Sequence, residues 1–521
     1  MTVDPVLVIA SEVEHPGSAR VWGSGAWTPP GEREARDWFG LSRLLGWGAQ
    51  VATPALEQIP EGVRWILVGC DPGAAAEPLM HALHSYLERE QALVVMRSPR
   101  ADEHLAGHSL CWSGPGEPAE WSLEHPIQCV RLDGPGDVWL ALDGEPAALA
   151  RRVGRGTVVT LGIHPSEARE HDPAVTAALR TLLTQGAGRA VAWFDMEGTL
   201  ALRMDDPGGS QNVHLEPFAY RELGPESWRE LASVLREREA RLGVAAVPGW
   251  IDDGEAERGD LLVRGERVER DAGRVHPSWA VTYRDQEGVA HDYVGEFATL
   301  RELAAEGVVD VALHGYTHVH ADVEAWASAP NRHEADGWYS EFGVSENEVP
   351  GVGDRLGTGL RMLEEFFGAR PSVLVFPNDA WTNQMLETAL ELDLSLVASY
   401  YVAVRAGDRW CWAEQLCAPY LDEPDARWFA SGLPVVGYFH ARDVALHGLE
   451  WMRDHLDAWS RAGASRFVSL GDLATALESR IAVDESSDGP RPIVMTPPGR
   501  SLRGVRVRCI GADGFERELD R

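Results

Sequence analysis

Two short polar stretches of the chain carry the residue types that metal-assisted hydrolysis requires. Arg203-Met204-Asp205-Asp206-Pro207 places two adjacent carboxylates directly after an apolar run, and His314-Gly315-Tyr316-Thr317-His318 places two imidazoles four residues apart. One carboxylate and two histidines are a sufficient ligand set for a divalent ion that keeps open positions for water and substrate. The second carboxylate is then placed to accept a proton from that water. The two motifs therefore favour hydrolysis at a metal centre.

Taken separately, each motif has a common alternative explanation. Pairs of aspartates are frequent on solvated loops, and a second pair, Asp252-Asp253, is assigned no role. Two histidines at i and i+4 are more often one face of a helix than a metal site. Both motifs, however, follow strand-like apolar runs. The first follows Ala190–Phe194 and then Leu200–Leu202, and the second follows Val308–Leu313. Since chemistry gathers at the carboxyl ends of the strands in a (β/α) barrel, we expect the two motifs to meet.

In this order, the two motifs resemble motifs 1 and 2 of the NodB-like polysaccharide deacetylases (carbohydrate esterase family 4). The resemblance is closer to a divergent branch that carries R-x-D-D and H-G-Y-x-H, and it covers most of residues 190–482. It implies that Asp205 is the general base. It also implies that Asp206, His314 and His318 bind one divalent metal ion, most simply Zn²⁺.

A histidine further along the chain completes the expected chemistry. Val435–His440 is an apolar run that ends in histidine, and the resemblance implies that His440 is the general acid for the leaving amine. An amide nitrogen leaves poorly unless it is protonated, and imidazole can supply a proton near neutral pH. Asp443, three residues later, is placed to orient the ring. The alternative is an exposed loop histidine without a catalytic role.

The third motif of the family departs from its usual form in this chain. Typical members carry R-x-P-Y, whereas this sequence reads Phe376-Pro377-Asn378-Asp379-Ala380-Trp381, without the arginine and the tyrosine. We expect Asn378 and Asp379 to provide polar substrate contacts and Trp381 to wall the pocket. Glu341, in Trp338-Tyr339-Ser340-Glu341-Phe342, resembles an E-F element of the divergent branch. Its role is to bind substrate, to brace a ligand, or simply to lie on a helix surface.

Several aromatic side chains after the predicted fifth barrel strand are candidates for stacking on sugar rings. Packing in the core would explain them equally well; they are Tyr400, Tyr401, Trp410 and Trp412. His320, two residues beyond His318, is expected to face solvent.

Residues 1–187 alternate short apolar runs with amphipathic segments. This pattern predicts a doubly wound parallel sheet and resembles the flavodoxin-like domain of class I glutamine amidotransferases. The place of the amidotransferase nucleophile reads Met96-Arg97-Ser98-Pro99 and holds no cysteine, while Cys70 ends the preceding strand. We therefore expect a non-catalytic domain that is a scaffold or binds a glycan or a partner. The expected strands are Val6–Ala10, Gln50–Thr53, Trp65–Val68, Ala92–Met96, Val138–Leu142 and Thr157–Leu161, and the expected helices are Glu32–Leu45 and Ala74–Arg89.

Residues 190–482 repeat a strand-then-helix pattern about seven times, which predicts an incomplete (β/α)7 barrel. The polar insertion Asp252–Tyr293 is expected to cover the site as a hairpin or long loop. Residues 485–521, in which Val505–Ile510 alternates, are expected to form a small C-terminal β appendage. The expected barrel strands are Ala190–Phe194, Val244–Pro248, Val308–Leu313, Val373–Phe376, Leu396–Ser399, Val435–Phe439 and Phe467–Leu470, and the helices are Pro225–Leu242, Glu296–Glu306, Arg355–Phe367, Asn383–Leu392 and Gly448–Arg461.

The composition argues against two classes of partner. The chain has 81 acidic and 47 basic residues, which gives a formal net charge of −34. Nucleic acids and anionic membranes bind basic surfaces, so neither is expected as a partner. Six cysteines without CxxC spacing indicate reduced thiols rather than a disulfide framework. The N-terminus enters a strand-like run without a signal-peptide pattern, so a cytoplasmic location is expected. The oligomeric state is not indicated.

The sequence thus predicts a metal-dependent deacetylase that removes an N-acyl group, most simply acetyl, from an N-acetylated sugar or glycan. One alternative keeps the site but changes the substrate to an N-acyl small molecule of a biosynthetic pathway. A third hypothesis is a catalytically silent carbohydrate-binding or scaffolding protein. Retention of all the inferred base and ligand positions argues against this third hypothesis.

Overall fold

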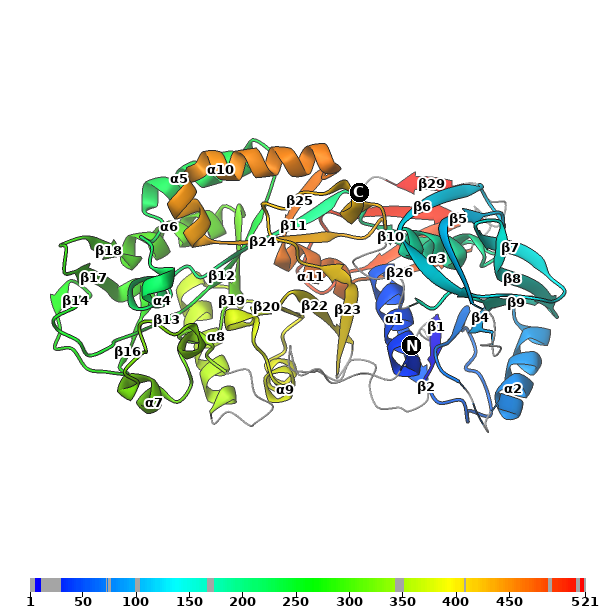
Figure 1. The fold of residues 1–521 in the computed structure, drawn as a ribbon, viewed down its shortest axis with the longest axis horizontal. Coiled ribbons are helices and arrows are strands. Elements are labelled where there is room, and N and C mark those ends of the chain that lie inside the picture. The colour runs from blue at the N-terminus through cyan, green and yellow to red at the C-terminus, as the bar shows by residue number, and fades with distance from the viewer. Residues whose placement is uncertain are drawn as a thin grey trace.

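Two large sheets lie side by side along the long axis of the molecule (Figure 1). Each sheet has nine strands and is covered by helices. The computed structural model describes residues 5–10, 30–71, 73, 76–98, 104–165, 173–342, 351–406, 409–485, 490–511 and 516–519.

The first sheet is half parallel and half antiparallel. Its order is β2-β1-β3-β4-β9-β8-β7-β5-β6, and the pairings from β2 to β9 are parallel. The long arm β5–β6 was not predicted. The parallel strands are β1 (Val6–Ile9), β2 (Ala49–Ala52), β3 (Trp65–Val68), β4 (Leu93–Arg97) and β9 (Gly156–Leu161); the others are β5 (His104–Trp112), β6 (Ala119–Val130), β7 (Asp137–Leu142) and β8 (Glu145–Val153).

Helices cover both faces of the parallel part of the first sheet, which explains why β1 and β3 are apolar at every position. Val6 and Val8 of β1 pack with α1 (Pro30–Leu44) and α3 (Pro173–Gln185), whereas Leu7 and Ile9 pack with α2 (Ala76–Arg89). Strands buried on both faces lose the alternation of a half-exposed strand. The predicted α/β class is confirmed, and the flavodoxin-like assignment of this domain stays a prediction.

The second sheet holds seven parallel strands and two antiparallel edge strands. Its order is β23-β22-β21-β20-β19-β12-β11-β24, with β25 beside β11. The parallel strands are β11 (Thr199–Asp205), β12 (Leu242–Ala246), β19 (Val309–Leu313), β20 (Val373–Val375), β21 (Leu396–Ala398), β24 (Val435–His440) and β25 (Arg466–Ser469); the edge strands are β22 (Tyr401–Ala406) and β23 (Arg409–Cys417).

One predicted strand of the barrel belongs to a different sheet. The run at 190–194 forms β10 (Val191–Asp195), which pairs antiparallel with β28 (Arg506–Ile510) near the C-terminus. A turn at Gly198, which has a φ of +73°, separates it from β11. The prediction that this run opens the barrel is therefore wrong, and β11 takes that place in the sheet. The apolar content of the two neighbouring runs did not distinguish them.

The helices of the second half differ from the predicted ones mainly at their ends. α5 (Pro225–Arg236) stops before Leu242, because Leu242 begins β12. α10 (Ala441–Ala462) begins seven residues before Gly448, which bends the helix with a φ of +78°. The remaining helices on the sheet are α6 (Tyr293–Ala305), α8 (Val352–Phe367), α9 (Asn383–Glu391) and α11 (Leu470–Glu478).

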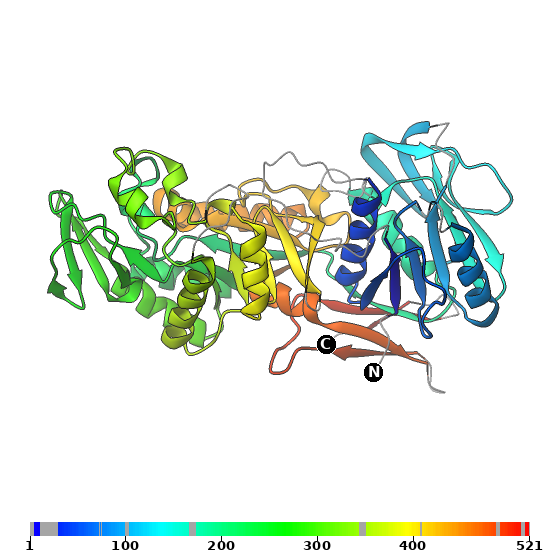
Figure 2. The same cartoon turned by 90° about the horizontal axis from the view of Figure 1, so that it is seen from below.

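Two smaller β structures complete the fold. The insertion carries β14 (Gly259–Val263), β15 (Glu266–Arg267), β17 (Val281–Asp285) and β18 (Ala290–Asp292) in one small sheet, beside the pair β13 (Gly249–Ile251) and β16 (Val275–Pro277). The C-terminal strands β26 (Arg480–Asp484), β27 (Arg491–Met495), β28 and β29 (Glu516–Leu519) lie beneath the junction of the two halves (Figure 2). None of the described helices is both long and apolar enough to cross a membrane.

A buried arginine links the two halves and generates a stability prediction. Arg43 of α1 donates to the carbonyl oxygen of Trp47 at 3.3 Å and to that of Leu477 in the last turn of α11. Because carbonyls in the last turn of a helix lack partners within the helix, a buried cation satisfies them well.

Replacing Arg43 by methionine keeps the apolar stem but removes these donors. We expect the free energy of unfolding to fall by about 2 kcal/mol, measured by denaturant titration. Arg89→Met is the matched control, since Arg89 is an exposed residue of α2 that donates only to Ser85 of its own helix. Equal unfolding midpoints for the two variants would contradict the role assigned to Arg43.

Candidate active site

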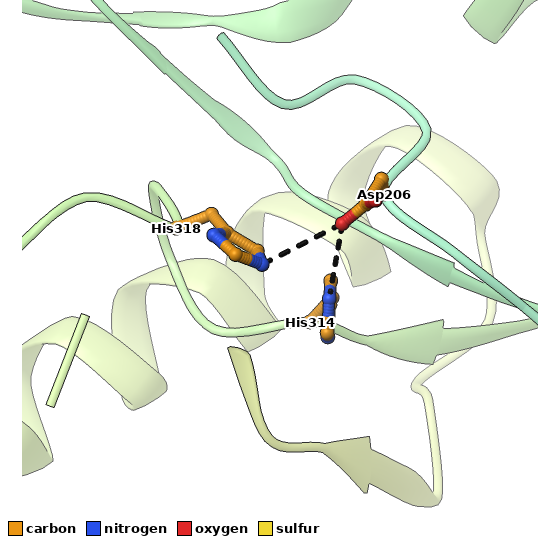
Figure 3. A group of neighbouring side chains, drawn as sticks. All are labelled: Asp206, His314 and His318. Atoms are coloured by element: carbon orange, nitrogen blue, oxygen red, sulfur yellow. Dashed lines mark ion pairs between the residues drawn. The ribbon is translucent and has the colours of Figure 1, made fainter. Parts of the chain in front are cut away.

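Three buried side chains converge where adjacent parallel strands end. Asp206 follows β11, and His314 and His318 lie on the loop after β19, with β12 between the two strands. The Oδ1 atom of Asp206 is 3.4 Å from Nε2 of His314 and 3.5 Å from Nε2 of His318 (Figure 3). The three residues are at most 7% exposed. The sequence prediction that the two motifs meet is consistent with this geometry.

The donor atoms of this group fit a divalent cation. One ligand atom from each residue lies within 4.8 Å of the others. Among the described residues, Oδ2 of Asp206 is buried without a hydrogen-bond partner. His314 directs Nδ1 to the carbonyl oxygen of Val375 at 3.0 Å, which leaves Nε2 to act as a ligand. A buried carboxylate with one oxygen near two ring nitrogens and its other oxygen without a partner fits a metal site.

The electrostatics of the group favour the ligand forms of Asp206 and His318, but not that of His314. Burial alone would raise the pKa of Asp206, but interactions with His314 and the other neighbouring histidines hold it below its usual value. Burial lowers the pKa of His318, and the nearby His314 adds to this effect. The pKa of His314 is raised, because contact with Asp206 outweighs burial. Asp206 is therefore ionised and His318 is neutral, which are the forms that bind metal.

A fully buried glutamate braces the histidine loop. Oε2 of Glu341 accepts the backbone N–H groups of Tyr316, Thr317 and His318 at 2.7, 3.2 and 3.1 Å. Its Oε1 accepts Nε of Arg355 at 2.8 Å. Glu341 is 0% exposed and does not line the cavity described below. Of the roles considered for Glu341, its contacts therefore support the bracing of a ligand. Its buried position does not support the predicted contact with substrate.

The backbone around the site is strained at the residues that face the cavity. Asp206, His318, Asn378 and Asp379 have φ values of +84°, +61°, +54° and +50°. Such conformations are costly for residues other than glycine and persist where surrounding contacts fix them. Gly315, with a φ of +67°, is required for a second reason, because a Cβ there would lie 2.2 Å from Oε2 of Glu341.

Asp205 is held by an arginine from its own motif. Nε of Arg203 donates to Oδ1 of Asp205 at 2.9 Å, and its NH2 group pairs with Oδ2. The same guanidinium contacts Oδ1 of Asp379 at 3.1 Å and lies 5.2 Å from the ring centre of Tyr438. Burial alone would lower the pKa of Arg203, but the charges of Asp205 and Asp379 raise it. Arg203 thus pairs with both Asp205 and Asp379, which belong to separate sequence motifs.

These residues open onto one cavity of about 300 Å³. Its wall contains the predicted Asp205, Asn378, Asp379 and Tyr400, together with the metal-binding group and His440. Three further tyrosines, Tyr339, Tyr420 and Tyr438, and an aspartate, Asp336, were not predicted. The full lining is Asp205, Asp206, Gln211, Leu215, Phe218, His314, His318, Asp336, Tyr339, Phe376, Asn378, Asp379, Tyr400, Tyr420, Tyr438 and His440.

Other predicted residues lie outside this cavity. Trp381 is 6% exposed and packs near Phe376 in the core, so its predicted place in the pocket wall is corrected. Trp410 is also buried and donates its indole N–H to Leu386, which indicates core packing. The side chain of Trp412 lies outside the described residues. No residue of the insertion lines the cavity within the described ranges, so the prediction that this segment covers the site is not supported.

His440 occupies the wall of the cavity at the end of β24, where it precedes α10. Burial alone would lower its pKa, but interaction with Asp443 and the charges of Asp206 and Asp205 raise it to about 9. The ring is therefore mostly protonated at neutral pH and can give up a proton. The role of His440 as general acid stays a prediction.

Two neighbours of the ligands gave no signal in the sequence. Nε2 of Gln211 donates to Oδ1 of Asp206 at 3.0 Å, and the side chain is buried. Tyr420 contacts His440 from a segment without a recognisable motif. Sequence patterns do not identify such residues, because neither residue belongs to a motif and their contacts arise only in the folded chain.

A second group of potential ligands is better explained as an ion-pair network. Asp253, Glu255 and His333 lie close enough to share a cation. Asp253, however, contacts the guanidinium groups of Arg270 and Arg258, and Glu255 contacts that of Arg332. Three arginines already supply the positive charge that a metal would bring, so no metal is assigned there. The Asp252-Asp253 pair is buried rather than solvated.

The first sheet carries Cys70 at its carboxyl edge. Burial raises the pKa of this thiol to about 12, and the charges of Glu34 and Asp71 add to the effect. A thiol, and not a thiolate, is therefore present at neutral pH, which disfavours nucleophilic chemistry. The non-catalytic role of this domain stays a prediction.

Comparisons with known proteins give only distant likenesses. No family model matches the chain, and no curated protein matches it. The carbohydrate deacetylase Agd3 is 8% identical, covers 96% of this chain and 93% of its own, and has a TM-score of 0.39. A putative polysaccharide deacetylase from Mycobacterium smegmatis is 13% identical over 55% of this chain and 92% of its own, with a TM-score of 0.31.

An exo-beta-1,4-mannosidase from Opitutaceae bacterium strain TAV5 is 15% identical over 35% of this chain, with a TM-score of 0.23. The match spans about a third of that enzyme, 34% of its length. Scores at this level carry no argument about fold or activity. The assignment below therefore depends on the geometry of the cavity.

The first prediction for this site concerns metal content. Protein purified without a histidine tag should carry about one zinc-like ion per chain. His314→Ala should weaken metal affinity by more than the roughly 10–100-fold that outer partners contribute. His320→Ala is the control, since the ring of His320 lies outside the group of ligands, where it accepts the N–H of Asp322 and packs against Trp338. Full occupancy in His314→Ala, measured by elemental analysis, would contradict the ligand assignment.

A second prediction concerns the brace. Glu341→Gln keeps the shape of the side chain but removes its charge. The amide has only one oxygen, so it can accept either the N–H groups of the loop or the guanidinium of Arg355, but not both. We expect metal affinity to fall by roughly 10–100-fold, as measured by competition with a chelator. Glu334→Gln alters an exposed glutamate of the same region and should leave affinity unchanged. Equal affinities in both variants would show that the brace does not hold the ligands.

Proposed function

We propose that the protein is a metal-dependent hydrolase that removes an N-acyl group, most simply acetyl, from an N-acetylated sugar or glycan. The observation that carries this proposal is the convergence of a metal-binding group, a second carboxylate that is paired with an arginine, and a charged imidazole on one cavity. Amide hydrolysis needs a site for a polarised water, a proton acceptor and a proton donor for the leaving amine. Each requirement has a matching side chain.

Asp206, His314 and His318 would hold the metal ion, for which their donor set suits Zn²⁺. When bound, the ion would acidify a water molecule and polarise the acyl carbonyl. The chain contributes the fixed orientation of the ligands. Glu341 holds the loop of His318, and the carbonyl of Val375 fixes the ring of His314. Gln211 fixes Oδ1 of Asp206 in the same way.

Asp205 is the proposed general base. Each of its oxygens accepts one hydrogen bond from Arg203, and each retains a lone pair that can accept a proton. The buried guanidinium fixes the plane of the carboxylate through these two contacts. Because Asp205 lines the cavity next to Asp206, it is within reach of the region where the water would lie.

His440 is the proposed general acid. Its raised pKa keeps the ring charged at the pH where Asp205 is ionised, so the two groups can act in opposite senses. The proton moves from the imidazolium to the amide nitrogen as the bond between the acyl carbon and that nitrogen breaks. The product is an amine, and the ring is left neutral.

The walls of the cavity support a sugar-like substrate. A volume of about 300 Å³ suits a small ligand, and the tyrosines Tyr400, Tyr420 and Tyr438 offer rings and hydroxyls along one wall. Asn378 and Asp379 add polar groups that can accept or donate to hydroxyls. Four aspartates and no arginine or lysine occur among the described lining residues. A neutral N-acyl substrate and a cationic amine product therefore fit better than an anionic sugar.

The division of roles between the adjacent aspartates gives a prediction. Asp205→Asn should keep the metal and lower kcat for an N-acetylated amino-sugar oligosaccharide by about 100-fold or more, because an amide cannot accept the proton. Asp206→Asn should instead lose the metal. Asp393→Asn, at an exposed turn, is the control for both measurements. Turnover near the wild-type rate in Asp205→Asn would exclude Asp205 as the base.

A further inference from the structure

Tyr420 lies between the proposed acid and its carboxylate partner. The segment that contains it runs beside β24, with a bridge between Tyr420 and Tyr438 and a hydrogen bond from the N–H of Leu421 to Tyr438. The hydroxyl of Tyr420 is 2.5 Å from Nδ1 of His440 and 2.9 Å from Oδ2 of Asp443. Nδ1 of His440 is 3.6 Å from that same carboxylate oxygen. The hydroxyl of Tyr420 therefore lies closer to the ring nitrogen and to the carboxylate oxygen than these two atoms lie to each other.

The positions of the protons between Asp443, Tyr420 and His440 follow from which of these groups can donate a hydrogen bond. Burial would raise the pKa of Asp443, but its contacts with His440 lower it, so the carboxylate is ionised and only accepts. The single proton of the Tyr420 hydroxyl is donated to Asp443. The hydroxyl oxygen can then only accept from His440, so Nδ1 of the ring must carry a proton.

Among the described residues, the hydroxyl of Tyr420 is the side-chain group that hydrogen-bonds to Nδ1 of His440, and the start of α10 lies against the same ring. The other groups near the ring are Asp205 and Asp206 from the end of β11, the ring of Phe218, the ring of Tyr438 and Arg442, whose guanidinium lies over Phe218. Asp443 also accepts the backbone N–H of His440 at 2.8 Å, which fixes the carboxylate at the start of α10. The tyrosine is held in turn by packing its ring against Tyr438, with centroids 4.6 Å apart.

We propose that Tyr420 is a positioning residue that fixes the tautomer of His440 by relaying the carboxylate of Asp443 to Nδ1. This inference rests on the proposed function, in which His440 is the acid. With a permanent proton on Nδ1, the proton that is gained and lost is the one on Nε2. During the reaction the Nε2–H bond breaks, a hydrogen–nitrogen bond forms on the leaving amine, and the electron pair of the carbon–nitrogen bond stays on that nitrogen.

The tautomer can be tested without catalysis. In protein labelled with ¹⁵N-histidine, Nδ1 of His440 should carry a downfield, slowly exchanging proton that is absent from His440→Gln. Tyr420→Phe should lose this protected resonance, whereas Tyr400→Phe, which alters another tyrosine of the cavity, should keep it. A wild-type ring protonated only on Nε2 in its neutral form would overturn the proposal. So would a protected Nδ1 proton that survives in Tyr420→Phe.

The role in proton donation can be tested by the choice of leaving group. An N-acetylated amino sugar needs a proton on its leaving amine, whereas 4-nitrophenyl acetate releases a stable phenolate without one. Tyr420→Phe should slow the amide by roughly 10-fold or more and change the aryl ester by less than about twofold. Tyr400→Phe should change both substrates by a similar factor. Equal slowing of amide and ester by Tyr420→Phe would contradict a role in positioning the acid.

A double-mutant cycle separates this role from a direct contact with substrate. In a His440→Gln background, adding Tyr420→Phe should have no further effect on the amide, because Tyr420 acts through His440. Additive losses would overturn the proposal. Wild-type protein that hydrolyses neither substrate would contradict the proposed function instead, and the Nδ1 resonance would still decide the tautomer.

Discussion

Three consecutive backbone N–H groups of the histidine loop, those of Tyr316, Thr317 and His318, donate to a single oxygen of Glu341. This interaction forces the loop into a tight path that His318 completes with a φ of +61°. The charge of Glu341 would be costly to bury alone, but Arg355 contacts its other oxygen. Gly315 is the residue that lets the loop approach so closely. If this contact is lost, the two imidazoles no longer share a position with Asp206.

The other charged side chains of the cavity are also fixed by partners that lie outside it or in its wall. Arg203 donates hydrogen bonds to both Asp205 and Asp379. Asp443 accepts from the hydroxyl of Tyr420, which in turn contacts His440. Each reactive group therefore has one face committed to a partner and another face toward the cavity. Such an arrangement keeps side chains in the charge state and orientation that chemistry needs before substrate arrives. The positive φ angles of Asn378 and Asp379 belong to the same arrangement.

The sequence was most informative where chemistry follows a strand. Asp206, His314 and His318 could be placed together because both motifs follow apolar runs, and most of the predicted strands fell within a residue or two of their expected bounds. It failed where partners are distant in the chain. Nothing local distinguishes β10, which pairs with β28, from a barrel strand. Tyr420 and Gln211 have no motif, and burial of Glu341 and Trp381 depends on contacts that periodicity does not encode.

The central claim is that Asp206, His314 and His318 bind a catalytic metal. Anomalous X-ray diffraction from crystals of protein purified without added metal, recorded above and below the zinc absorption edge, tests it most directly. The account predicts one strong anomalous peak bonded to Oδ2 or Oδ1 of Asp206 and to Nε2 of both histidines. Crystals that show no such peak after zinc is supplied, or a peak only beside Asp253, Glu255 and His333, would contradict it.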